Sequence, residues 1–319
     1  MSGGSDSLAL LHLSHDWAQA RGRDLIAFTF DHHLRDASAD EAVRVGEICR
    51  ALGIRHETLQ WDAPVSRQSA ARRARHAALA CALKAHGGAI LLTGHTADDQ
   101  AETFLMRARQ GSTWYGLAGM QALSPSPVWP EGEGVRIARP LLTARRSDLR
   151  YELKSRGADW VEDPTNDNPV YERVQMRQLL AGSPGLHAQI SRCLTDVTAL
   201  RAIEDVRLGR WLRDHVSVSG VAHITADMTM LGPESGARGM GILIQAVTGR
   251  ETPPRRENLQ SLADRVRAPR AFAGATLGCA KVSRQGNIVH LVPEAGLDGP
   301  DPLLIRRLTD LQGLLLDHA

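Results

Sequence analysis

Two short stretches of the sequence combine residues that could carry out chemistry on a charged ligand. The first is Ser2-Gly3-Gly4-Ser5-Asp6-Ser7, which runs directly into a helical pattern. Its glycines allow a sharp turn, and its N–H groups, hydroxyls and helix N-terminus together suit a phosphate group. The stretch matches neither the Walker A loop, whose lysine it lacks, nor the dinucleotide-binding G-x-G-x-x-G loop. A serine-rich helix cap without a ligand is the simpler alternative.

The second stretch, residues 94–103, is rich in acidic side chains. Asp98 and Glu102 are four residues apart and so share a helix face, and Asp99 lies at the same helix start. Acidic residues at a helix start can also be present only because they interact favourably with the helix dipole, without any ligand. Because both stretches are of the kind that follows a strand, we expect them at one edge of a sheet. Carboxylates facing a phosphate loop are what a Mg²⁺–nucleotide needs.

Strands and helices alternate along the first half of the chain. Apolar runs predict strands at 25–30, 56–61, 89–93 and 137–142. Helical periodicity appears at 5–20, 40–52, 67–86, 98–109 and 146–155. This alternation predicts an α/β fold with a parallel sheet covered by helices on both faces, in which ligands bind at the carboxyl ends of the strands.

The pattern changes after Ser183-Pro184-Gly185. Helices are expected at 187–215, 236–248 and 255–267, followed by a hairpin over 275–292 that turns at Gln285-Gly286. A chain of 319 residues is long enough for two domains. We expect a catalytic domain over 1–184, a smaller and mainly helical domain with a β-hairpin over 185–293, and a tail over 294–319.

Composition narrows the class of protein. Hydrophobic residues make up 43% and charged residues 23%, and no apolar run is long enough to cross a bilayer. The first residues lack the basic start of a secretory signal, so we expect a cytoplasmic protein without membrane contact. Four widely spaced cysteines argue against a disulfide framework, a zinc ribbon or an iron–sulfur site. The net charge of +2 is small, but basic residues gather in 136–156 and 250–270. These two stretches could be RNA-binding patches or solvated helix faces.

Taken in order, the motifs of this chain resemble those of the N-type ATP pyrophosphatase (PP-loop) proteins, and among them the tRNA(Ile)-lysidine synthases. The series is SGGSDS, FTFDHHLR, ARRARHAAL, TGHTADDQAETFLMR, RQGSTWYGLAGM, RPLL and WVEDPTN, from residue 2 to about residue 180. The stretch from Ala275 to Cys279 resembles the small tRNA-facing domain of that family. SGGSDS marks the superfamily, whereas GHTADDQAETFLMR, GLAGM and EDPTN narrow the resemblance to the lysidine enzymes.

The resemblance implies an adenine nucleotide alpha hydrolase-like catalytic domain and a carbon–nitrogen ligase. Such an enzyme converts the wobble cytidine of a CAU-anticodon tRNA(Ile) to lysidine with ATP, Mg²⁺ and free L-lysine, which changes codon reading from AUG to AUA. The cytidine C2 oxygen would attack the α-phosphate and release pyrophosphate. The lysine ε-amine would then displace AMP from the adenylated base. The protein could form a homodimer, which the sequence does not decide.

The same resemblance implies roles for individual residues. The cofactor-binding set is Ser2, Gly3, Gly4, Ser5, Asp6, Ser7, Asp31, His32 and Gly94. The catalytic set is Asp6, His95, Asp98, Asp99 and Glu102, with Asp6 and Asp98 as Mg²⁺ ligands. The set expected to meet substrate or tRNA is His33, Arg72, Arg75, Arg107, Arg139, Glu162, Asp163, Asn166, Arg173 and Arg177.

Several of these residues have simpler explanations. The arginines could be surface salt-bridge partners, and Glu162, Asp163 and Asn166 could serve capping or Asx turns. Trp114 and Tyr115 are candidate stacking platforms for bases, with ordinary packing as the alternative.

The sequence also departs from the family. Arg173-Val174-Gln175-Met176-Arg177 stands where R-N-R-I-R is usual, so a contact to tRNA or ATP is expected to be missing. Residues 295–319 are too few for the further C-terminal domain of larger members. Only Met1 precedes the phosphate loop, so we expect about 15 to 30 residues upstream, including one apolar strand.

Three alternatives remain open from the sequence. A PP-loop enzyme that thiolates tRNA shares the adenylation chemistry, but the isolated cysteines disfavour it. Amide-forming ligases of the GMP or NAD synthetase type share only the first motif. An RNA-binding homologue with an inactive nucleotide site is the third.

Overall fold

The computed structural model describes residues 1–31, 37–61, 68–162, 170–183, 185–219, 223–250 and 252–294, with the backbone alone given for residues 37–41 and 68–69. The chain divides into two units, Met1–Ala199 and Leu200–Ala319. Among the described residues, no helix combines the length and apolar character needed to cross a membrane.

The first unit alternates strands and helices, as the sequence predicts. Its helices are α1 (Ser5–Arg21), α2 (Ala37–Ala51), α3 (Gln68–Ala85), α4 (Ala97–Arg109), α5 (Trp114–Leu117), α6 (Arg146–Ser155) and α7 (Glu172–Gly182). Its strands are β1 (Ile26–Asp31), β2 (Arg55–Gln60), β3 (Ile90–Leu92), β4 (Leu123–Pro125) and β5 (Arg136–Ala138). Of these strands, β1 is mostly buried, whereas β2 has no buried residue. Gly22 ends α1 in the left-handed conformation that an L side chain rarely adopts.

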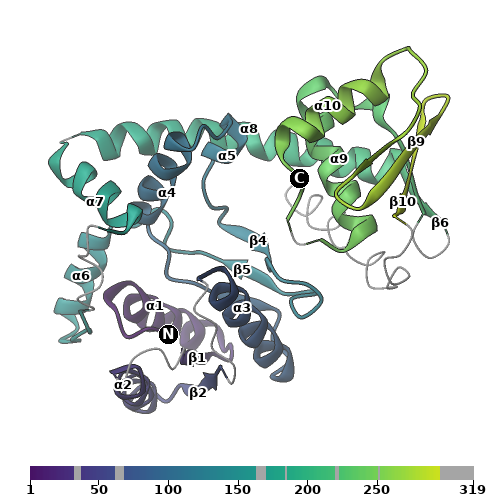
Figure 1. The fold of residues 1–319 in the computed structure, drawn as a ribbon. Coiled ribbons are helices and arrows are strands. Elements are labelled where there is room, and N and C mark those ends of the chain that lie inside the picture. Colours follow the sequence, from purple (N-terminus) through teal and green to yellow (C-terminus); the bar gives the residue numbers. More distant parts are fainter. Residues whose placement is uncertain are drawn as a thin grey trace. The chain divides into compact units, whose positions relative to one another are not determined.

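The strands of this unit form two hydrogen-bonded groups. β1 and β2 pair in parallel, with Ile26 opposite Arg55. β3 pairs with β5 in parallel, and β4 pairs with β5 in the antiparallel direction. Figure 1 shows α1 and α2 with the β1–β2 pair, and α3 beside β5. The acidic segment from residue 94 follows the carboxyl end of β3, as expected for an α/β fold, whereas residues 2–7 come before the first described strand.

Separate apolar clusters hold these layers together. One joins α1, β1, α2 and α6 and contains Leu8, Val45 and Leu153. Another joins α3 to β1, β3 and β5 through Phe28, Leu83 and Ile137. A third joins α4 to the first half of α8 (Leu186–His215) through Ala101, Ile190 and Leu194.

The second unit contains more strand than the sequence predicts. Its helices are the second half of α8, α9 (Pro233–Thr248) and α10 (Arg256–Arg267), with a short 3₁₀ turn, η2 (Met228–Met230). A five-stranded antiparallel sheet has the order β6-β7-β10-β9-β8, with bounds Val216–Ser219, His223–Asp227, Ile288–Pro293, Ala280–Gln285 and Ala275–Leu277. The predicted hairpin is confirmed as β9 and β10, and it pairs with strands that the sequence reading missed.

The division between the units falls inside α8. The cause is the third cluster, because Ile190 and Leu194 pack with α4 of the first unit. Further along α8, Leu208 and Leu212 belong to the core of the second unit. One continuous helix therefore supplies apolar residues to both units.

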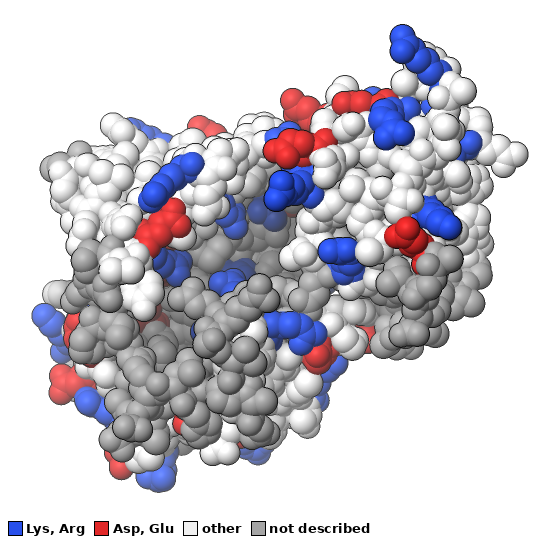
Figure 2. Space-filling view, viewed as in Figure 1, with Lys and Arg blue, Asp and Glu red and all other residues white. Residues whose placement is uncertain are grey.

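Basic and acidic side chains are mixed on the surface. On the face of the molecule shown in Figure 2, Lys and Arg lie next to Asp and Glu. Within 250–270, Arg265 lies over the Phe272 ring, with 5.4 Å from its guanidinium carbon to the ring centre. Arg284 donates hydrogen bonds to the carbonyls of Val266 and Ala268 and so closes the end of α10. Part of this arginine-rich stretch is therefore structural.

The packing of α6 allows a direct test of the apolar cluster that joins α1, β1, α2 and α6. Leu153 is completely buried, whereas Tyr151 on the same helix is 76% exposed. We expect Leu153→Ala to lower the free energy of unfolding of the first unit by about 2–5 kcal/mol, because it leaves a cavity. Tyr151→Ala should change it by less than about 0.5 kcal/mol. Denaturant unfolding of both variants measures this, and equal losses would contradict the assignment of α6 to the core.

Candidate active site

The predicted phosphate loop leads straight into α1. Gly3 has φ +72°, and Gly4 takes the N-cap position of the helix. The Ser7 hydroxyl donates to the Gly4 carbonyl at 3.0 Å, and the Ser2 and Ser7 oxygens are 3.2 Å apart. The first amides of α1 have no partner within the helix, so the loop offers both hydroxyls and N–H groups to an anion.

The end of β3 packs tightly against this loop. A Cβ atom on Gly94 would lie 2.9 Å from the backbone oxygen of Asp6, which is closer than such atoms approach. Gly94 is therefore required by the close approach of two backbones, and it brings the strand end and the start of α1 together. This supports the expectation that the two polar stretches share one edge.

The acidic stretch begins α4 with a capping box. The Thr96 hydroxyl accepts from the Asp99 N–H at 3.3 Å, and Asp99 Oδ2 accepts from the Thr96 N–H at 2.8 Å. One oxygen of Asp99 is thus committed to the helix start, as in an ordinary capping box. The other oxygen, Oδ1, faces the guanidinium of Arg146 at 3.3 Å.

Arg146 joins the phosphate loop to the acidic helix. Its guanidinium lies 2.9 Å from Asp6 Oδ2, 3.3 Å from Asp99 Oδ1 and 3.6 Å from Glu102 Oε1. Burial disfavours the charge of this group, but Asp6, Asp99 and Glu102 outweigh it and raise the pKa of Arg146. The catalytic residues Asp6, Asp99 and Glu102 that the sequence predicted are therefore brought together by one arginine.

Glu102 is the most enclosed carboxylate of the group. Its side chain has no exposed surface, and Arg173 and Arg177 of α7 each donate to it at 3.0 Å. An ionised carboxylate is stable without water only when charged partners of this kind surround it. Arg173 and Arg177, expected to meet the substrate or tRNA, thus pair with Glu102, one of the carboxylates predicted to be catalytic.

Asp98 pairs with the first residues of α6. It accepts from the backbone N–H of Arg146 at 2.7 Å and from the Arg145 guanidinium at 3.1 Å. Burial raises the pKa of Asp98, but these hydrogen bonds outweigh it, so the net pKa is lowered. Asp98 therefore caps the start of α6, and its role as a Mg²⁺ ligand stays a prediction.

The carboxylates were also tested as a metal site. Within the described residues, no group of three or more His, Cys, Asp or Glu side chains is arranged to hold a metal ion. Mg²⁺ commonly takes only one or two carboxylates and completes its shell with phosphate oxygens and water. Asp6 lies at the phosphate loop, but its Oδ2 is paired with Arg146 at 2.9 Å, so its role as a Mg²⁺ ligand stays a prediction.

His95 lies near both acidic and basic groups. Its Nδ1 is 3.0 Å from the Thr93 hydroxyl. Burial lowers the pKa of His95 to about 4, and although Asp99 opposes this shift, Arg139, Arg173 and Arg72 add to it. The imidazole is therefore neutral near pH 7, which suits it to hydrogen bonding better than to proton abstraction from an amine.

The remaining predicted residues occupy varied positions. Asp31 is buried at the end of β1, and Glu162 pairs with Arg150 at 3.0 Å. Arg107 donates to the carbonyls of Gly116 and Gly119 and so braces the loop after α4. Trp114 and Tyr115 contact each other edge to face. His32, His33, Asp163 and Asn166 lie outside the described residues.

The departure at 173–177 leaves the carboxylate cluster complete. Val174 is buried, and the Gln175 side-chain oxygen faces Arg109 at 3.5 Å. The two arginines that match the family, Arg173 and Arg177, both reach Glu102. The substituted positions lie away from this ion-pair group.

The sequence reading missed the role of Arg145 and Arg146. Both were counted only as members of a basic patch, although they stand at the very start of α6. Basic residues at a helix N-terminus oppose the helix dipole, so their placement signals carboxylate partners elsewhere in the fold. The position of these arginines could therefore have indicated that they pair with carboxylates. It could not have indicated which carboxylates these are.

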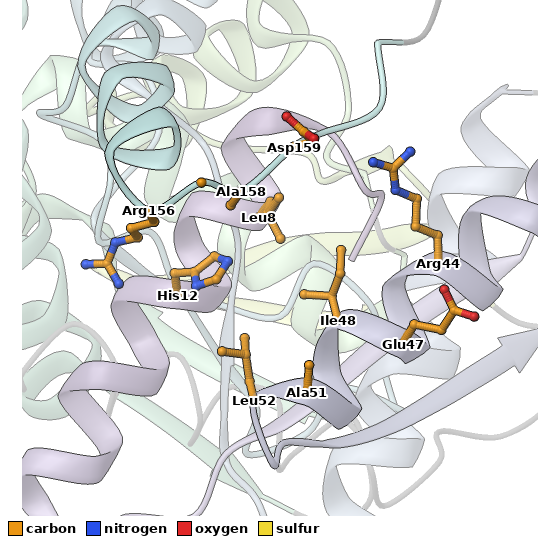
Figure 3. Close-up of a pocket in the computed structure, with 11 residues that line it drawn as sticks. Leu8, His12, Arg44, Glu47, Ile48, Ala51, Leu52, Arg156, Ala158 and Asp159 are labelled. Carbon is orange, nitrogen blue, oxygen red and sulfur yellow. The ribbon is translucent and has the colours of Figure 1, made fainter.

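A pocket lies apart from this cluster. It has a volume of about 380 Å³ and lies among α1, α2 and the end of α6. Figure 3 shows apolar Leu8, Ile48 and Leu52 on its walls, with His12 and Arg156 beside them. None of the predicted site residues lines it.

Comparisons with known proteins place this geometry in a family. The PP-loop domain model matches residues 1–183. The chain is 51% identical to the tRNA(Ile)-lysidine synthase of Hyphomonas neptunium, over 93% of this chain and 81% of that protein. It is 39% identical to the Brucella suis enzyme of the same name over 80% of this chain and 58% of that enzyme, and 36% identical to the Caulobacter vibrioides enzyme over 88% and 62%.

A solved structure supports the fold. The U34-tRNA thiolase NcsA from Methanococcus maripaludis matches 62% of this chain and 70% of its own with a TM-score of 0.51 at 18% identity. The fold and the loop at residues 2–7 thus define a PP-loop protein with an ATP-binding domain. Within that class, the chain belongs to the tRNA(Ile)-lysidine synthase family.

The bridging position of Arg146 predicts a large stability effect. Arg146→Gln would leave Asp6 and Asp99 without their shared cation, and we expect a loss on the order of 3 kcal/mol in the free energy of unfolding. Arg150→Gln is the matched control on the same helix, because Arg150 pairs with the exposed Glu162 and should cost less than about 1 kcal/mol. Denaturant unfolding separates the two, and equal effects would contradict the bridging role.

Two histidines whose pKa values are lowered by burial, His76 and His95, predict a pH dependence of stability. Burial and the positive charges of Arg75, Arg72 and Arg139 lower the pKa of His76 to about 4, and the pKa of His95 is also about 4. The unfolded chain binds more protons at these residues between about pH 6.5 and pH 4. The first unit should therefore lose stability as the pH falls through this range. Melting temperatures of the wild type and His76→Gln test this, since the variant should show a shallower decline and an unchanged decline would contradict it.

Proposed function

We propose that this protein ligates free L-lysine to C2 of the wobble cytidine of CAU-anticodon tRNA(Ile), using ATP and releasing pyrophosphate and AMP. The observation that carries the proposal is the convergence of the phosphate loop and three family-matching carboxylates on Arg146, in a chain 51% identical to a tRNA(Ile)-lysidine synthase. Modification of this base would change codon reading from AUG to AUA. The proposal places the enzyme in the cytoplasm and leaves a homodimer open.

The phosphate loop would bind the part of ATP that leaves as pyrophosphate. The hydroxyls of Ser2 and Ser7, which lie 3.2 Å apart, and the first amides of α1 would donate to the β- and γ-phosphates. Asp31 at the end of β1 and Gly94 at the end of β3 would border the nucleoside and the phosphate chain, with His32 and His33 next in sequence. Mg²⁺, when bound at Asp6, would neutralise charge on the phosphate oxygens.

The carboxylates of α4 would serve the amine substrate. A lysine ε-ammonium requires negative partners to bind and must lose a proton before it attacks. Asp99 and Glu102 supply this negative charge, and a lysine ammonium that binds there would have to take the place of an arginine partner at one of these oxygens. His95, neutral near pH 7, would position the base or the phosphate through a ring nitrogen. Asp98 would hold the start of α6, and with it Arg146, in position beside these carboxylates.

RNA recognition would require a flipped anticodon base and contacts to its phosphates. Arg72, Arg75, Arg107, Arg139, Arg173 and Arg177 are the arginines proposed for the substrate side, with Glu162, Asp163 and Asn166 near the incoming lysine or base. The arginines of 250–270 would add phosphate contacts from the second unit.

Thiolation is the nearest competing activity. Enzymes of that kind use paired cysteines or a cluster, whereas the cysteines here lie on separate segments: Cys49 on α2, Cys81 on α3, Cys193 on α8 and Cys279 in the β8–β9 turn. The proposal therefore favours lysine over sulfur as the second substrate.

Incubation with ATP, labelled lysine and CAU-anticodon tRNA(Ile) tests the proposal. We expect lysine to enter the tRNA, with one AMP formed for each lysine. Elongator tRNA(Met), which carries the same anticodon, is the matched control and should remain unlabelled. ATP turnover without lysine dependence, or tRNA binding without turnover, would contradict the proposal.

Asp98→Asn tests whether the start of α4 and α6 must stay charged. We expect a folded protein whose lysine incorporation is lost, because the amide cannot pair with Arg145 as the carboxylate does. Asp148→Asn, an exposed carboxylate in the first turn of the same α6, is the control and should keep its activity. Circular dichroism verifies folding. An unchanged rate in Asp98→Asn would mean that Asp98 is only a helix-start acid.

A further inference from the structure

The segment between α5 and β4, residues 118–122, contains neither helix nor strand and is called the 118–122 loop below. Its first two residues, Ala118 and Gly119, are buried. Buried backbone N–H and C=O groups cost free energy unless they are hydrogen-bonded, and this loop has no ladder of its own to pair them. Side chains of other elements supply the missing partners.

Gln100 of α4 pairs with the loop in both directions. Its Nε2 donates to the Met120 carbonyl, and its Oε1 accepts from the Met120 N–H, both at 2.8 Å. A primary amide suits this pairing because it carries a donor and an acceptor side by side, whereas a carboxylate only accepts. The loop passes so close that a Cβ atom on Gly119, whose φ is +70°, would lie 2.6 Å from Gln100 Oε1. Glycine at position 119 and glutamine at position 100 thus fit each other.

Two further side chains hold the loop in place. Arg107, two turns further along the same face of α4, donates to the Gly116 carbonyl at 2.6 Å and to the Gly119 carbonyl at 3.1 Å. The Thr198 hydroxyl of α8 donates to the Ala118 carbonyl at 3.3 Å. The loop is therefore fixed mainly to α4, the helix that carries the acidic residues of the candidate site.

The other end of the loop holds Arg139. The Gln121 carbonyl accepts from Arg139 Nη1 at 2.9 Å, and the Ser124 hydroxyl accepts from the same nitrogen at 2.9 Å. The Ala122 carbonyl accepts from the backbone N–H of Arg139 at 2.7 Å. Gln121 directly follows the residue that Gln100 holds, so a shift of the loop at that point would also move the carbonyl that orients Arg139.

We propose that Gln100 is a positioning residue for the substrate side of the site: its amide fixes the 118–122 loop on α4 and thereby fixes the direction of the Arg139 guanidinium. Gln100 itself touches no ligand. Arg139 has only neutral hydrogen-bond partners among the described residues, so its charge is available to an anionic ligand. A guanidinium that is held in place before the ligand arrives loses less freedom on binding, so a looser one binds more weakly. The inference rests on the proposed function in one respect, namely that Arg139 meets tRNA(Ile) or ATP.

A double-mutant cycle on ligand binding tests whether Gln100 acts through Arg139. The Kd values for tRNA(Ile) and for ATP are measured for the wild type, Gln100→Leu, Arg139→Gln and the double variant. We expect Arg139→Gln to weaken the binding of one of these ligands, and Gln100→Leu to raise the same Kd about tenfold. In the Arg139→Gln background, Gln100→Leu should add less than about twofold, because the two residues act through one contact.

Two variants control for general effects of the substitution. Gln110 directly follows α4, is exposed, and makes no side-chain hydrogen bond in the described part of the chain, so Gln110→Leu should change neither Kd. Gln100→Glu keeps the acceptor for the Met120 N–H but loses the donor to the Met120 carbonyl, so we expect a smaller rise in Kd. Circular dichroism verifies folding, and the cycle is run with Gln100→Glu if the leucine variant does not fold.

Several results would overturn the positioning role. One is a rise in Kd from Gln100→Leu that is as large without Arg139 as with it, which is what a merely structural role would give. Another is an Arg139→Gln variant that binds both ligands as the wild type does. The role is also overturned if Gln100→Leu leaves both Kd values unchanged, or if Gln110→Leu weakens binding equally.

The outcome is separable from that of the proposed function, because the cycle measures binding and not lysine transfer. A wild-type protein that fails to incorporate lysine, but shows the expected coupling between Gln100 and Arg139, would contradict the proposed activity and keep the positioning role. Lysine incorporation by the wild type without that coupling would contradict the positioning role alone.

Discussion

The burial of Glu102 is the constraint on which the rest of the active-site region depends. A carboxylate without solvent contact must be surrounded by positive charge, and Arg146, Arg173 and Arg177 provide it from two helices. Arg146 also reaches Asp6, so the same charge that stabilises Glu102 fixes the start of α1. The positions of α1, α4, α6 and α7 are therefore coupled through one ion-pair network instead of through apolar packing alone.

This network also separates the charges that a substrate would meet. Asp6, Asp98, Asp99 and Glu102 each have arginine partners, so the acidic side is balanced before any ligand arrives. Arg72, Arg75 and Arg139 have no acidic partner among the described residues and leave the neighbouring surface positive. His95 feels charges from both groups, Asp99 on one hand and Arg139 and Arg72 on the other, and burial keeps its imidazole neutral.

The sequence predicted those parts of the site that depend on local pattern. The turn at residues 2–7 and the start of α4 are each encoded by glycines, caps and acids within about ten residues. The role of Arg146 was not predictable in this way, because Asp6 lies 140 residues earlier in the chain. α7 was missed because the sequence before it shows no periodic pattern. β6 and β7 were missed because they gain their order from pairing with β10 and with each other. The continuity of α8 across both units depends on which cores receive Ile190 and Leu208, which periodicity alone does not specify.

The departure from the family at residues 173–177 becomes intelligible from the geometry of α7. Arg173 and Arg177 are four residues apart and so lie on one helix face, where both reach Glu102. Val174 occupies a different face and is buried, a setting in which a valine packs without the hydrogen-bond partners that an asparagine would need. Gln175 faces Arg109, away from the carboxylates. The substitutions therefore alter the sides of the helix that do not meet Glu102, and the charge balance of the cluster is kept because only the two arginines that contribute to it are required.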